Sequence, residues 1–308
     1  MRVAVLCNDR LGIPALQQLV QSKLVAAVGT SDRSPEMIAL MQQVTAQAGV
    51  PSAIFEEENL EDNLSSWLSR HKPDVVLVKT FPYRIPASLL DVPTHGFINF
   101  HYAPLPGYRG SNPLFWMIKE QVAMGGVSVH KMDKNFDSGP LLMQMNVPIN
   151  AGDSFGLCCT QLAYAGLQLT GPLLQALSSG TAKPVVQEKV SKRWYGRPGA
   201  GDATVHWNKM NAGQVSALAC ACNPWLKGAV TTIKGWTIGI TNATPADVPV
   251  EAGTLPGTIL RISRQEGLVV ACSESTSVAV DVVYTEEGYF AGHQLSKFNI
   301  KPHDQFQS

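Results

Sequence analysis

The run Asp74-Val75-Val76-Leu77-Val78-Lys79 is almost entirely apolar and is bounded by Pro73 and Pro82. A short apolar run without alternation predicts a strand that is covered on both faces, as the strands of parallel sheets are. Three more runs of this kind precede it, at residues 3–7, 24–29 and 51–55. Stretches with a helical hydrophobic period separate them, at residues 14–21, 36–48 and 60–69. This alternation predicts an α/β fold with a doubly wound, mostly parallel sheet.

The region that follows continues the α/β pattern. We expect strands at residues 97–100 and 126–132 and helices at residues 113–119 and 153–177. The last helix should be interrupted near Gly171-Pro172, because proline breaks helices. Open parallel sheets bind ligands beyond the carboxyl ends of their strands. The loop at residues 80–86, which follows the strand at residues 74–79, is therefore a candidate site.

A chain of 308 residues exceeds the usual size of one hydrophobic core. We expect a catalytic domain at residues 1–180, a linker at residues 181–204 and a second domain at residues 205–308. The linker is basic, with Lys183, Lys189, Lys192, Arg193 and Arg197. Beyond it, a helix at residues 211–220 and five short strands predict a small β-barrel. These strands lie at residues 229–233, 236–241, 258–262, 268–272 and 278–284.

Composition argues against several classes of protein. No apolar run is long enough to span a bilayer, and the first residues do not read as a signal peptide, so we expect a cytoplasmic protein. The six cysteines are scattered, and Cys220 and Cys222 fall short of zinc-site spacing, so we expect neither disulfides nor a metal. Residues 8–12 lack Gly-x-Gly-x-x-Gly, and no phosphate loop occurs. Nicotinamide dehydrogenases and nucleotide-phosphate hydrolases are therefore disfavoured.

Two polar side chains, Asn99 and His101, interrupt an apolar strand that leads into a loop rich in glycine and proline. Because successive side chains of a strand alternate, these two point to the same face. Both need hydrogen-bond partners, so a polar cleft explains them better than a core does. Taken alone, an Asn-x-His motif is usually explained by two structural side chains whose hydrogen bonds are satisfied within the fold.

A carboxylate can approach this pair from the segment Met132-Asp133-Lys134-Asn135-Phe136-Asp137-Ser138-Gly139-Pro140. Asp137 lies on a turn after a predicted strand, where it can hold His101 charged or correctly oriented. Taken alone, Asp-Ser-Gly is typical of an ordinary turn. An amide, an imidazole and a carboxylate, without a serine or cysteine nucleophile, suit direct acyl transfer in which the incoming amine is the nucleophile.

Taken together, these segments resemble the formyltransferase family that uses 10-formyltetrahydrofolate. The mark of that family is Gly-x-Ile-Asn-x-His followed by Leu-Pro and Arg-Gly, which reads here as Gly96, Ile98-Asn99, His101, Leu105-Pro106 and Arg109-Gly110. The resemblance continues at the family's spacing through Pro113, Trp116, residues 126–129, Met132-Asp133 and residues 137–140. More weakly, residues 223–229 and 256–259 resemble the carboxyl domain of methionyl-tRNA formyltransferases and their amino-sugar relatives.

The resemblance implies a Rossmann-like formyltransferase domain followed by a smaller OB-like domain. It also implies that Asn99, His101 and Asp137 are catalytic and that 10-formyltetrahydrofolate is the formyl donor. In the mechanism we expect, Asn99 and a protonated His101 stabilise the oxyanion as the acceptor amine attacks the formyl carbon. Asp137 raises the pKa of His101 and accepts the amine proton through water.

The folate loop implied by the resemblance, residues 80–86, departs from the glycine- and leucine-rich form common in the family, and Ala103 replaces the usual serine. We expect two aromatic side chains of this loop to line a slot for the flat pterin ring, while backbone groups pair with its amide edge. The residues expected at the folate are Phe81, Tyr83, Arg84, Ile85, Pro86 and Asp133. The alternative is a loop that packs on the core. Tyr108 or Arg109 is expected near the acceptor, although Arg109 also reads as a surface charge.

The charge of the chain bears on the identity of the acceptor. Lysine plus arginine and aspartate plus glutamate number 24 each, and residues 205–308 hold seven basic against eight acidic residues. RNA affinity rests on basic surface, and the loop at residues 30–35 is shorter and less basic than in tRNA enzymes of the family. We therefore expect the acceptor to be a small or carrier-linked amine, with tRNA disfavoured. The basic linker could nevertheless bind tRNA or a nucleotide-sugar.

Two other classes of protein stay open. A formyltetrahydrofolate hydrolase would release formate from the same donor, but hydrolases of this family usually carry a regulatory domain before the catalytic one. A binding protein without catalysis is the third possibility, against which the intact Asn99, His101 and Asp137 argue. The sequence does not indicate an oligomeric state.

Overall fold

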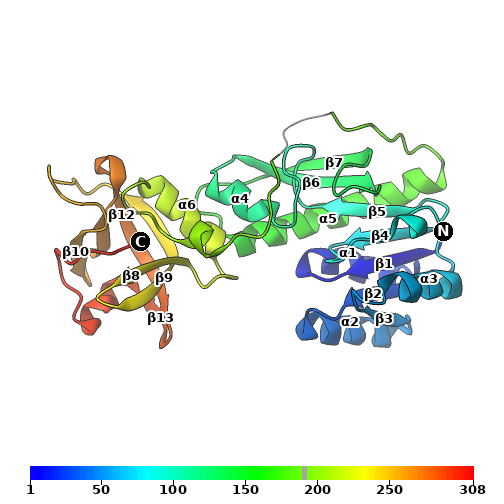
Figure 1. Ribbon diagram of the computed structural model, residues 1–308, viewed down its shortest axis with the longest axis horizontal. Coiled ribbons are helices and arrows are strands. Elements are labelled where there is room, and N and C mark those ends of the chain that lie inside the picture. Colours follow the sequence, from blue (N-terminus) through cyan, green and yellow to red (C-terminus); the bar gives the residue numbers. More distant parts are fainter. Residues whose placement is uncertain (189–192) are drawn as a thin grey trace. The chain divides into compact units, whose positions relative to one another are not determined.

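The computed structural model describes residues 1–188 and 193–308, which form two compact units (Figure 1). The first unit comprises Met1–Gly110, Met124–Pro148 and Cys159–Tyr195, and the second comprises Ser111–Ala123, Ile149–Cys158 and Gly196–Ser308. The two units thus alternate along the chain, and the consecutive domain ranges drawn from the sequence stay a prediction. Within the predicted linker, Lys189 and Lys192 lie outside the described residues.

A seven-stranded sheet with the order β3-β2-β1-β4-β5-β6-β7 forms the centre of the first unit (Figure 1). Its strands are β1 (Val3–Cys7), β2 (Val25–Ser31), β3 (Ser52–Phe55), β4 (Val75–Lys79), β5 (Phe97–His101), β6 (Met124–Lys131) and β7 (Leu141–Pro148). Strands β1 to β5 pair in parallel, whereas β6 and β7 are antiparallel additions beside β5. The predicted mostly parallel, doubly wound sheet is confirmed, and β7 is an edge strand that the sequence reading did not include.

The helices begin and end close to the predicted positions. They are α1 (Ile13–Gln21), α2 (Pro35–Ala48), α3 (Leu60–His71), α4 (Pro113–Lys119) and α5 (Phe155–Ser178). The predicted interruption near Gly171-Pro172 is wrong, because α5 continues through Pro172. A proline costs a helix one backbone hydrogen bond. Burial of the neighbouring Leu169 and Leu173 opposes that cost and keeps this part of the helix packed.

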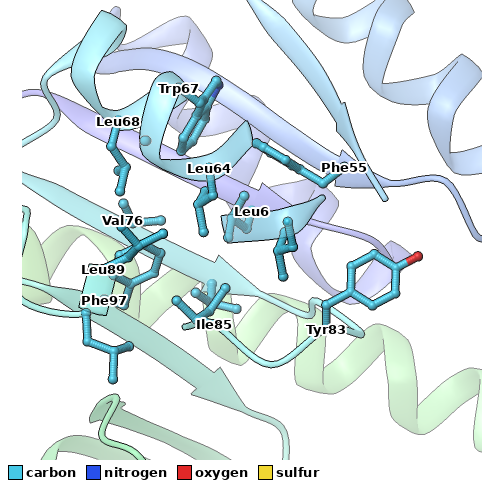
Figure 2. Close-up of a cluster of buried hydrophobic side chains, with 14 of the residues drawn as sticks. Leu6, Phe55, Leu64, Trp67, Leu68, Val76, Tyr83, Ile85, Leu89 and Phe97 are labelled. Atoms are coloured by element: carbon cyan, nitrogen blue, oxygen red, sulfur yellow. The ribbon is translucent and has the colours of Figure 1, made fainter. Parts of the chain in front are cut away.

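The main hydrophobic cluster of the first unit lies between α3 and the sheet and reaches the loop after β4 (Figure 2). Phe55 and Trp67 meet edge to face at 5.6 Å, an arrangement that aromatic rings favour. Tyr83 and Ile85 also belong to this cluster, with exposed fractions of 5% and 4%. Packing of these two side chains anchors the loop at residues 80–86 at the carboxyl edge of the sheet.

Lys79, the last residue of β4, is fully buried and ties β4 and β5 to α5. Its Nζ donates to Thr170 Oγ1 at 2.7 Å and to the Gly166 carbonyl at 3.2 Å, and it lies 2.9 Å from the centre of the Phe100 ring. Burial lowers the pKa of Lys79 well below its usual value. These contacts fix the end of β4 next to the strand that carries Asn99.

The second unit contains α6 (Ala212–Cys222) and a six-stranded antiparallel sheet. Its strands are β8 (Ala229–Ile233), β9 (Trp236–Ala246), β10 (Ile259–Ser263), β11 (Gly267–Ala271), β12 (Ser277–Thr285) and β13 (Gly288–Ala291). The five predicted strands are present, and β13 is a sixth that pairs with β12. The C-terminal segment bridges Thr232 on β8 and Thr258 just before β10, so it links the two edges of the sheet. Closing a sheet in this way removes exposed strand edges.

Candidate active site

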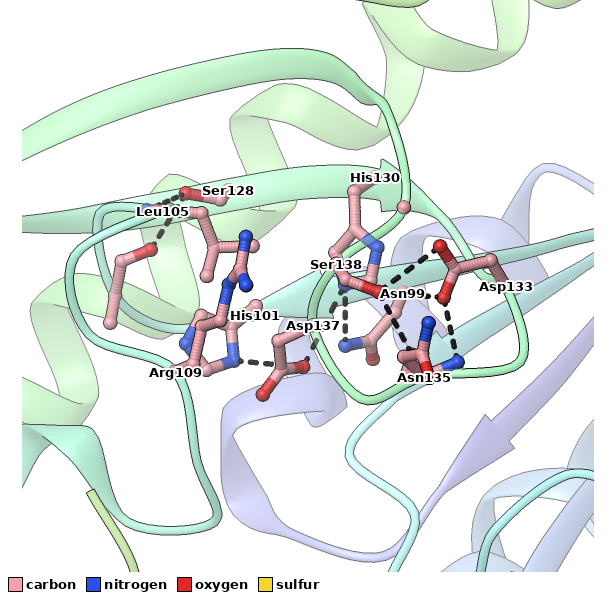
Figure 3. Close-up of polar contacts among 12 residues, drawn as sticks. Asn99, His101, Leu105, Arg109, Ser128, His130, Asp133, Asn135, Asp137 and Ser138 are labelled. Atoms are coloured by element: carbon pink, nitrogen blue, oxygen red, sulfur yellow. Dashed lines mark hydrogen bonds and ion pairs between the residues drawn. The ribbon is translucent and has the colours of Figure 1, made fainter. Parts of the chain in front are cut away.

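Strand β5 presents Asn99 and His101 on one face, as the two-residue period predicts (Figure 3). Strand β6 runs antiparallel beside it, with His130 opposite Asn99 and Ser128 opposite His101. Because residues directly opposite each other in a sheet share a face, the four polar side chains form one group. His101, His130 and Ser128 are all buried, with exposed fractions of 6% or less.

The loop between β6 and β7 brings Asp137 to this group. Asp137 Oδ1 lies 3.5 Å from His101 Nδ1, and Oδ2 accepts a hydrogen bond of 3.0 Å from the Gly110 N–H. Asp137 has a positive φ of 52°, a conformation that aspartate tolerates better than most residues. The structure therefore brings Asn99, His101 and Asp137 together, although they lie up to 38 positions apart in the chain.

Burial and neighbouring charges change the pKa values of His101 and Asp137 in different ways. Burial raises the pKa of Asp137, but attraction to His101, the contact with His130 and the Gly110 N–H outweigh it, so the pKa lies below its usual value and Asp137 is ionised at neutral pH. Burial lowers the pKa of His101, and Asp137 offsets this only in part. The pKa of His101 therefore lies below its usual value, although Asp137 raises it as expected, and the role of a protonated His101 in the reaction stays a prediction.

The ring nitrogens of His101 have distinct surroundings. Nε2 lies 2.6 Å from the Tyr108 carbonyl, which can only accept, so Nε2 carries the hydrogen. In the neutral ring Nδ1 then holds a lone pair that faces the Asp137 carboxylate. A proton delivered to Nδ1 would convert this contact into an ion pair. The carboxylate therefore favours a proton on Nδ1, whereas burial of the ring disfavours it.

His130 is a site residue that the sequence reading missed. Its Nε2 lies 3.2 Å from Asn99 Nδ2 and 3.8 Å from Asp137 Oδ1, and its Nδ1 lies 3.1 Å from the Lys131 carbonyl (Figure 3). The available signal was the alternation of polar Ser128 and His130 with apolar residues in the predicted strand at residues 126–132, which puts His130 at the position that pairs with Asn99. To predict the contact between His130 and Asn99, the register of β5 and β6 must be known, and the sequence alone does not give it.

Gln187 is a second residue that the sequence reading missed. Its Nε2 donates to the carbonyls of Asp137 and Gly139 at 3.0 and 2.7 Å, and its Oε1 accepts from Arg109 Nη2 at 2.8 Å. Gly139 lies so close to β6 that a Cβ there would be 1.8 Å from the Lys131 carbonyl oxygen. These contacts fix the backbone that carries Asp137.

Ser128 holds the loop that follows His101. Its hydroxyl donates to the Ala103 carbonyl at 2.7 Å and accepts from the Leu105 N–H at 2.9 Å. Gln144 of β7 supports both ends of this contact, because its Nε2 lies within 2.9 Å of Ser128 Oγ and donates to the Leu105 carbonyl at 2.8 Å. The edge strand β7 therefore contributes to the position of the loop at residues 103–105.

Most of the residues predicted at the folate lie in or near the loop after β4. Phe81 is partly buried and contacts the rings of Phe55 and Tyr83 at 6.2 and 5.5 Å. The Tyr83 hydroxyl donates to Asp32. Ile85 is in the core, so its side chain faces away from solvent, while Pro86 is half-buried.

Arg84 and Asp133 lie closer to the Asp137 loop. Arg84 is exposed, donates to the Lys134 carbonyl and lies 5.7 Å from the centre of the Phe136 ring. Asp133 accepts hydrogen bonds from the Asn135 N–H and the Ser138 hydroxyl, both at 2.8 Å. Arg84 thus joins the loop after β4 to the loop that contains Asp137, and Asp133 shapes the latter.

The residues predicted near the acceptor flank His101. The Tyr108 ring packs on Tyr195 at 4.5 Å between ring centres, and the Tyr108 carbonyl contacts His101. Arg109 bonds to Gln187 through one guanidinium nitrogen, while its buried Nε has no partner in the described part of the chain. Among the described residues, no group of three or more histidine, cysteine, aspartate or glutamate side chains is placed to hold a metal ion.

Comparison with known proteins agrees with this geometry. A family model described as formyl transferase matches residues 1–168. The methionyl-tRNA formyltransferase of Aromatoleum aromaticum is 31% identical over 259 residues, which cover 84% of this chain and 78% of the relative. That of Bacillus velezensis is 28% identical over 286 residues, covering 91% and 88%. The open α/β sheet and these matches define the class, and the chain belongs to the formyltransferase family.

Solved structures share the fold. The N-formyltransferase from Helicobacter canadensis, solved with folinic acid and dTDP-3-aminofucose, has a TM-score of 0.68 at 14% identity and covers 91% of this chain and 98% of its own. HypX from Aquifex aeolicus has a TM-score of 0.68 at 17% identity and covers 97% of this chain. This chain spans about half the length of HypX, 49%. None of the helices described here has the length and apolar character needed to cross a membrane.

Proposed function

We propose that this enzyme transfers the formyl group of 10-formyltetrahydrofolate to a primary amine of a small or carrier-linked acceptor. The observation that carries the proposal is the convergence of Asn99, His101 and Asp137 at the end of β5. An amide donor beside a buried imidazole–carboxylate pair provides both stabilisation of an oxyanion and a place for a proton.

The proposed reaction begins when the amine nitrogen attacks the formyl carbon and the carbonyl electrons move onto oxygen. The Nδ2–H of Asn99 donates to this oxygen as its negative charge develops. The new ammonium loses one proton to His101 Nδ1, where Asp137 stabilises the resulting imidazolium. The carbonyl then re-forms, the bond from the formyl carbon to N10 of the folate breaks, and N10 receives that proton.

Residues of two adjacent loops are proposed to bind the donor. Arg84 links the loop at residues 80–86 to the loop that carries Asp137, which supports a donor site formed by both loops. Because Tyr83 and Ile85 pack in the core, we assign folate recognition in the first loop to backbone groups of residues 84–86 and to the partly exposed face of Phe81. Asp133 shapes the second loop. HypX has been solved in complex with tetrahydrofolic acid, which supports a folate donor for this fold.

The acceptor is proposed to lie beside Arg109. Its Nε is a buried donor without a partner among the described residues, and such groups are costly unless a ligand satisfies them. A balanced overall charge, with 24 basic and 24 acidic residues, favours a small or carrier-linked amine over an RNA. Methionyl-tRNA is the second candidate acceptor, because the relatives aligned over most of the chain carry that activity in their names.

Incubation with 10-formyltetrahydrofolate and separate acceptors tests the proposal, with product masses as the readout. The acceptors are amino-sugar nucleotides, simple primary amines, methionyl-tRNA and, as a control, no acceptor. A formylated small amine supports the proposal, and formylated methionyl-tRNA selects the second candidate. Release of formate alone identifies a hydrolase. An unchanged donor with every acceptor would overturn formyl transfer.

A further inference from the structure

His130 contacts the side-chain amide of Asn99 and is almost fully buried, with an exposed fraction of 2%. Its position follows from the register of the sheet, since His130 on β6 stands directly opposite Asn99 on β5. A buried imidazole is costly unless both ring nitrogens find partners. Here both do, and the two partners differ in chemistry.

The contact to Lys131 fixes the tautomer of His130. Nδ1 lies 3.1 Å from the Lys131 carbonyl, which only accepts hydrogen bonds, whereas the Asp137 carboxylate lies farther from Nε2, at 3.8 Å, so we assign the hydrogen to Nδ1. In the neutral ring Nε2 is then an acceptor, and it lies 3.2 Å from the side-chain amide of Asn99. The NH2 end of that amide is the end that can donate to it.

From this geometry we infer that His130 is a positioning residue that sets the amide orientation of Asn99. One N–H of Asn99 Nδ2 is donated to His130, which leaves the second N–H to donate to the formyl oxygen. A flipped amide would place its own oxygen against the lone pair of His130 Nε2 and would offer no donor from that end. The inference rests on the proposed formyl transfer and adds a residue to it.

A purely structural role makes a different prediction. If His130 only fills the sheet, its substitution lowers stability and affects turnover equally whether or not Asn99 is present. If His130 acts through Asn99, the two substitutions are not additive, because without the amide there is nothing left to orient. The coupling between the two residues therefore separates the two roles.

The experiment measures kcat, the donor KM and the melting temperature for His130→Met and His130→Gln, each alone and combined with Asn99→Ala. Methionine has a similar size but is a weak acceptor, whereas the Oε1 of glutamine can replace Nε2. We expect His130→Met to lower kcat by about 10- to 100-fold with little change in KM, less than the roughly 100- to 1,000-fold expected for loss of an oxyanion donor. His130→Gln should recover most of the lost turnover. In the Asn99→Ala background, His130→Met should add little.

Three results would overturn the inference: full turnover in His130→Met, no recovery in His130→Gln, or an equal loss with and without Asn99. If His130→Met does not fold, His130→Asn replaces it, because its shorter side chain can meet the Lys131 carbonyl without reaching Asn99. His206→Met, at an exposed position in the second unit, is the matched control. A wild-type protein that transfers no formyl group contradicts the proposed function itself, which is a separate outcome from failure of the His130 variants.

Discussion

Nδ1 of His101 lies 3.5 Å from Oδ1 of Asp137, and both side chains are almost entirely removed from solvent, with 7% and 11% exposed. The pair combines an ionised carboxylate with an imidazole whose pKa burial lowers. In the proposed reaction the acceptor amine loses a proton to this pair as it attacks. The pH dependence of the reaction therefore reports on His101.

The first prediction concerns the pH profile of kcat/KM. The accepting form of His101 is neutral, so the rate should rise with pH, level off, and show an apparent pKa below the unperturbed histidine value of about 6.5. Initial rates between about pH 4.5 and pH 9, expressed per concentration of the unprotonated acceptor amine, check this. A rate that declines as His101 loses its proton would show that the imidazolium is the active form.

Asp137→Asn tests the electrostatic part of the pair. The carboxylate raises the pKa of His101 against the effect of burial, so its removal should move the acidic limb of the profile to lower pH and reduce turnover. The Asn side-chain oxygen can still accept the Gly110 N–H, which preserves the loop. Asp91→Asn, at an exposed ion pair with Lys131, is the matched control. A limb displaced to higher pH would contradict the assigned role of Asp137.

The pKa of His101 also predicts how stability depends on pH. Because the folded pKa lies below the unfolded value, the unfolded chain binds more protons in acid, and stability falls as pH drops below about 6.5. Asp137, whose folded pKa is also lowered, adds a loss at lower pH, below about 3.9. His101→Gln should flatten the melting temperature between about pH 7 and pH 5 relative to wild type. If the melting temperatures of the two proteins change equally with pH, the lowered pKa assigned to His101 is wrong.

Gln187→Ala should destabilise the loop that carries Asp137. The substitution removes the partner of one buried and one partly buried carbonyl and of the Arg109 guanidinium, so we expect a loss of about 1–3 kcal/mol in the free energy of unfolding. Turnover should fall as well, because the position of Asp137 depends on this backbone. Urea denaturation and initial rates measure both effects, and Gln175→Ala, at an exposed position on α5, is the control. Wild-type values in both measurements would exclude the role given to Gln187.

Local sequence patterns predicted much of the fold. The apolar runs at β1 and β4 identified the parallel sheet, and the two-residue period placed Asn99 and His101 on one face. The edge strand β7 has an alternating burial pattern but follows directly on the turn that ends at Pro140, and it was not recognised. Pro172 was read as a helix break, whereas packing of α5 overrides the local preference of proline.

The rest of the site depends on contacts between residues far apart in the chain, which no local sequence pattern predicts. His130 meets Asn99 through the register of two antiparallel strands, and Gln187 reaches Asp137 from 50 positions away. The pKa of His101 depends on how deeply the ring is buried, which outweighs the neighbouring carboxylate. Tyr83 was expected to line a slot for the pterin ring, but it is buried in the core cluster, with Phe81 and Arg33 against its ring. Each difference arises from tertiary packing.

The turnover of Asn99→Ala is the most direct test of the central claim that the Asn99 amide stabilises the oxyanion. The substitution should lower kcat about 100- to 1,000-fold while donor affinity, measured separately by equilibrium binding, stays near that of wild type. Asn63→Ala, at an exposed position on α3, should leave both quantities unchanged. A folded Asn99→Ala enzyme that transfers formyl groups at close to the wild-type rate would contradict the account.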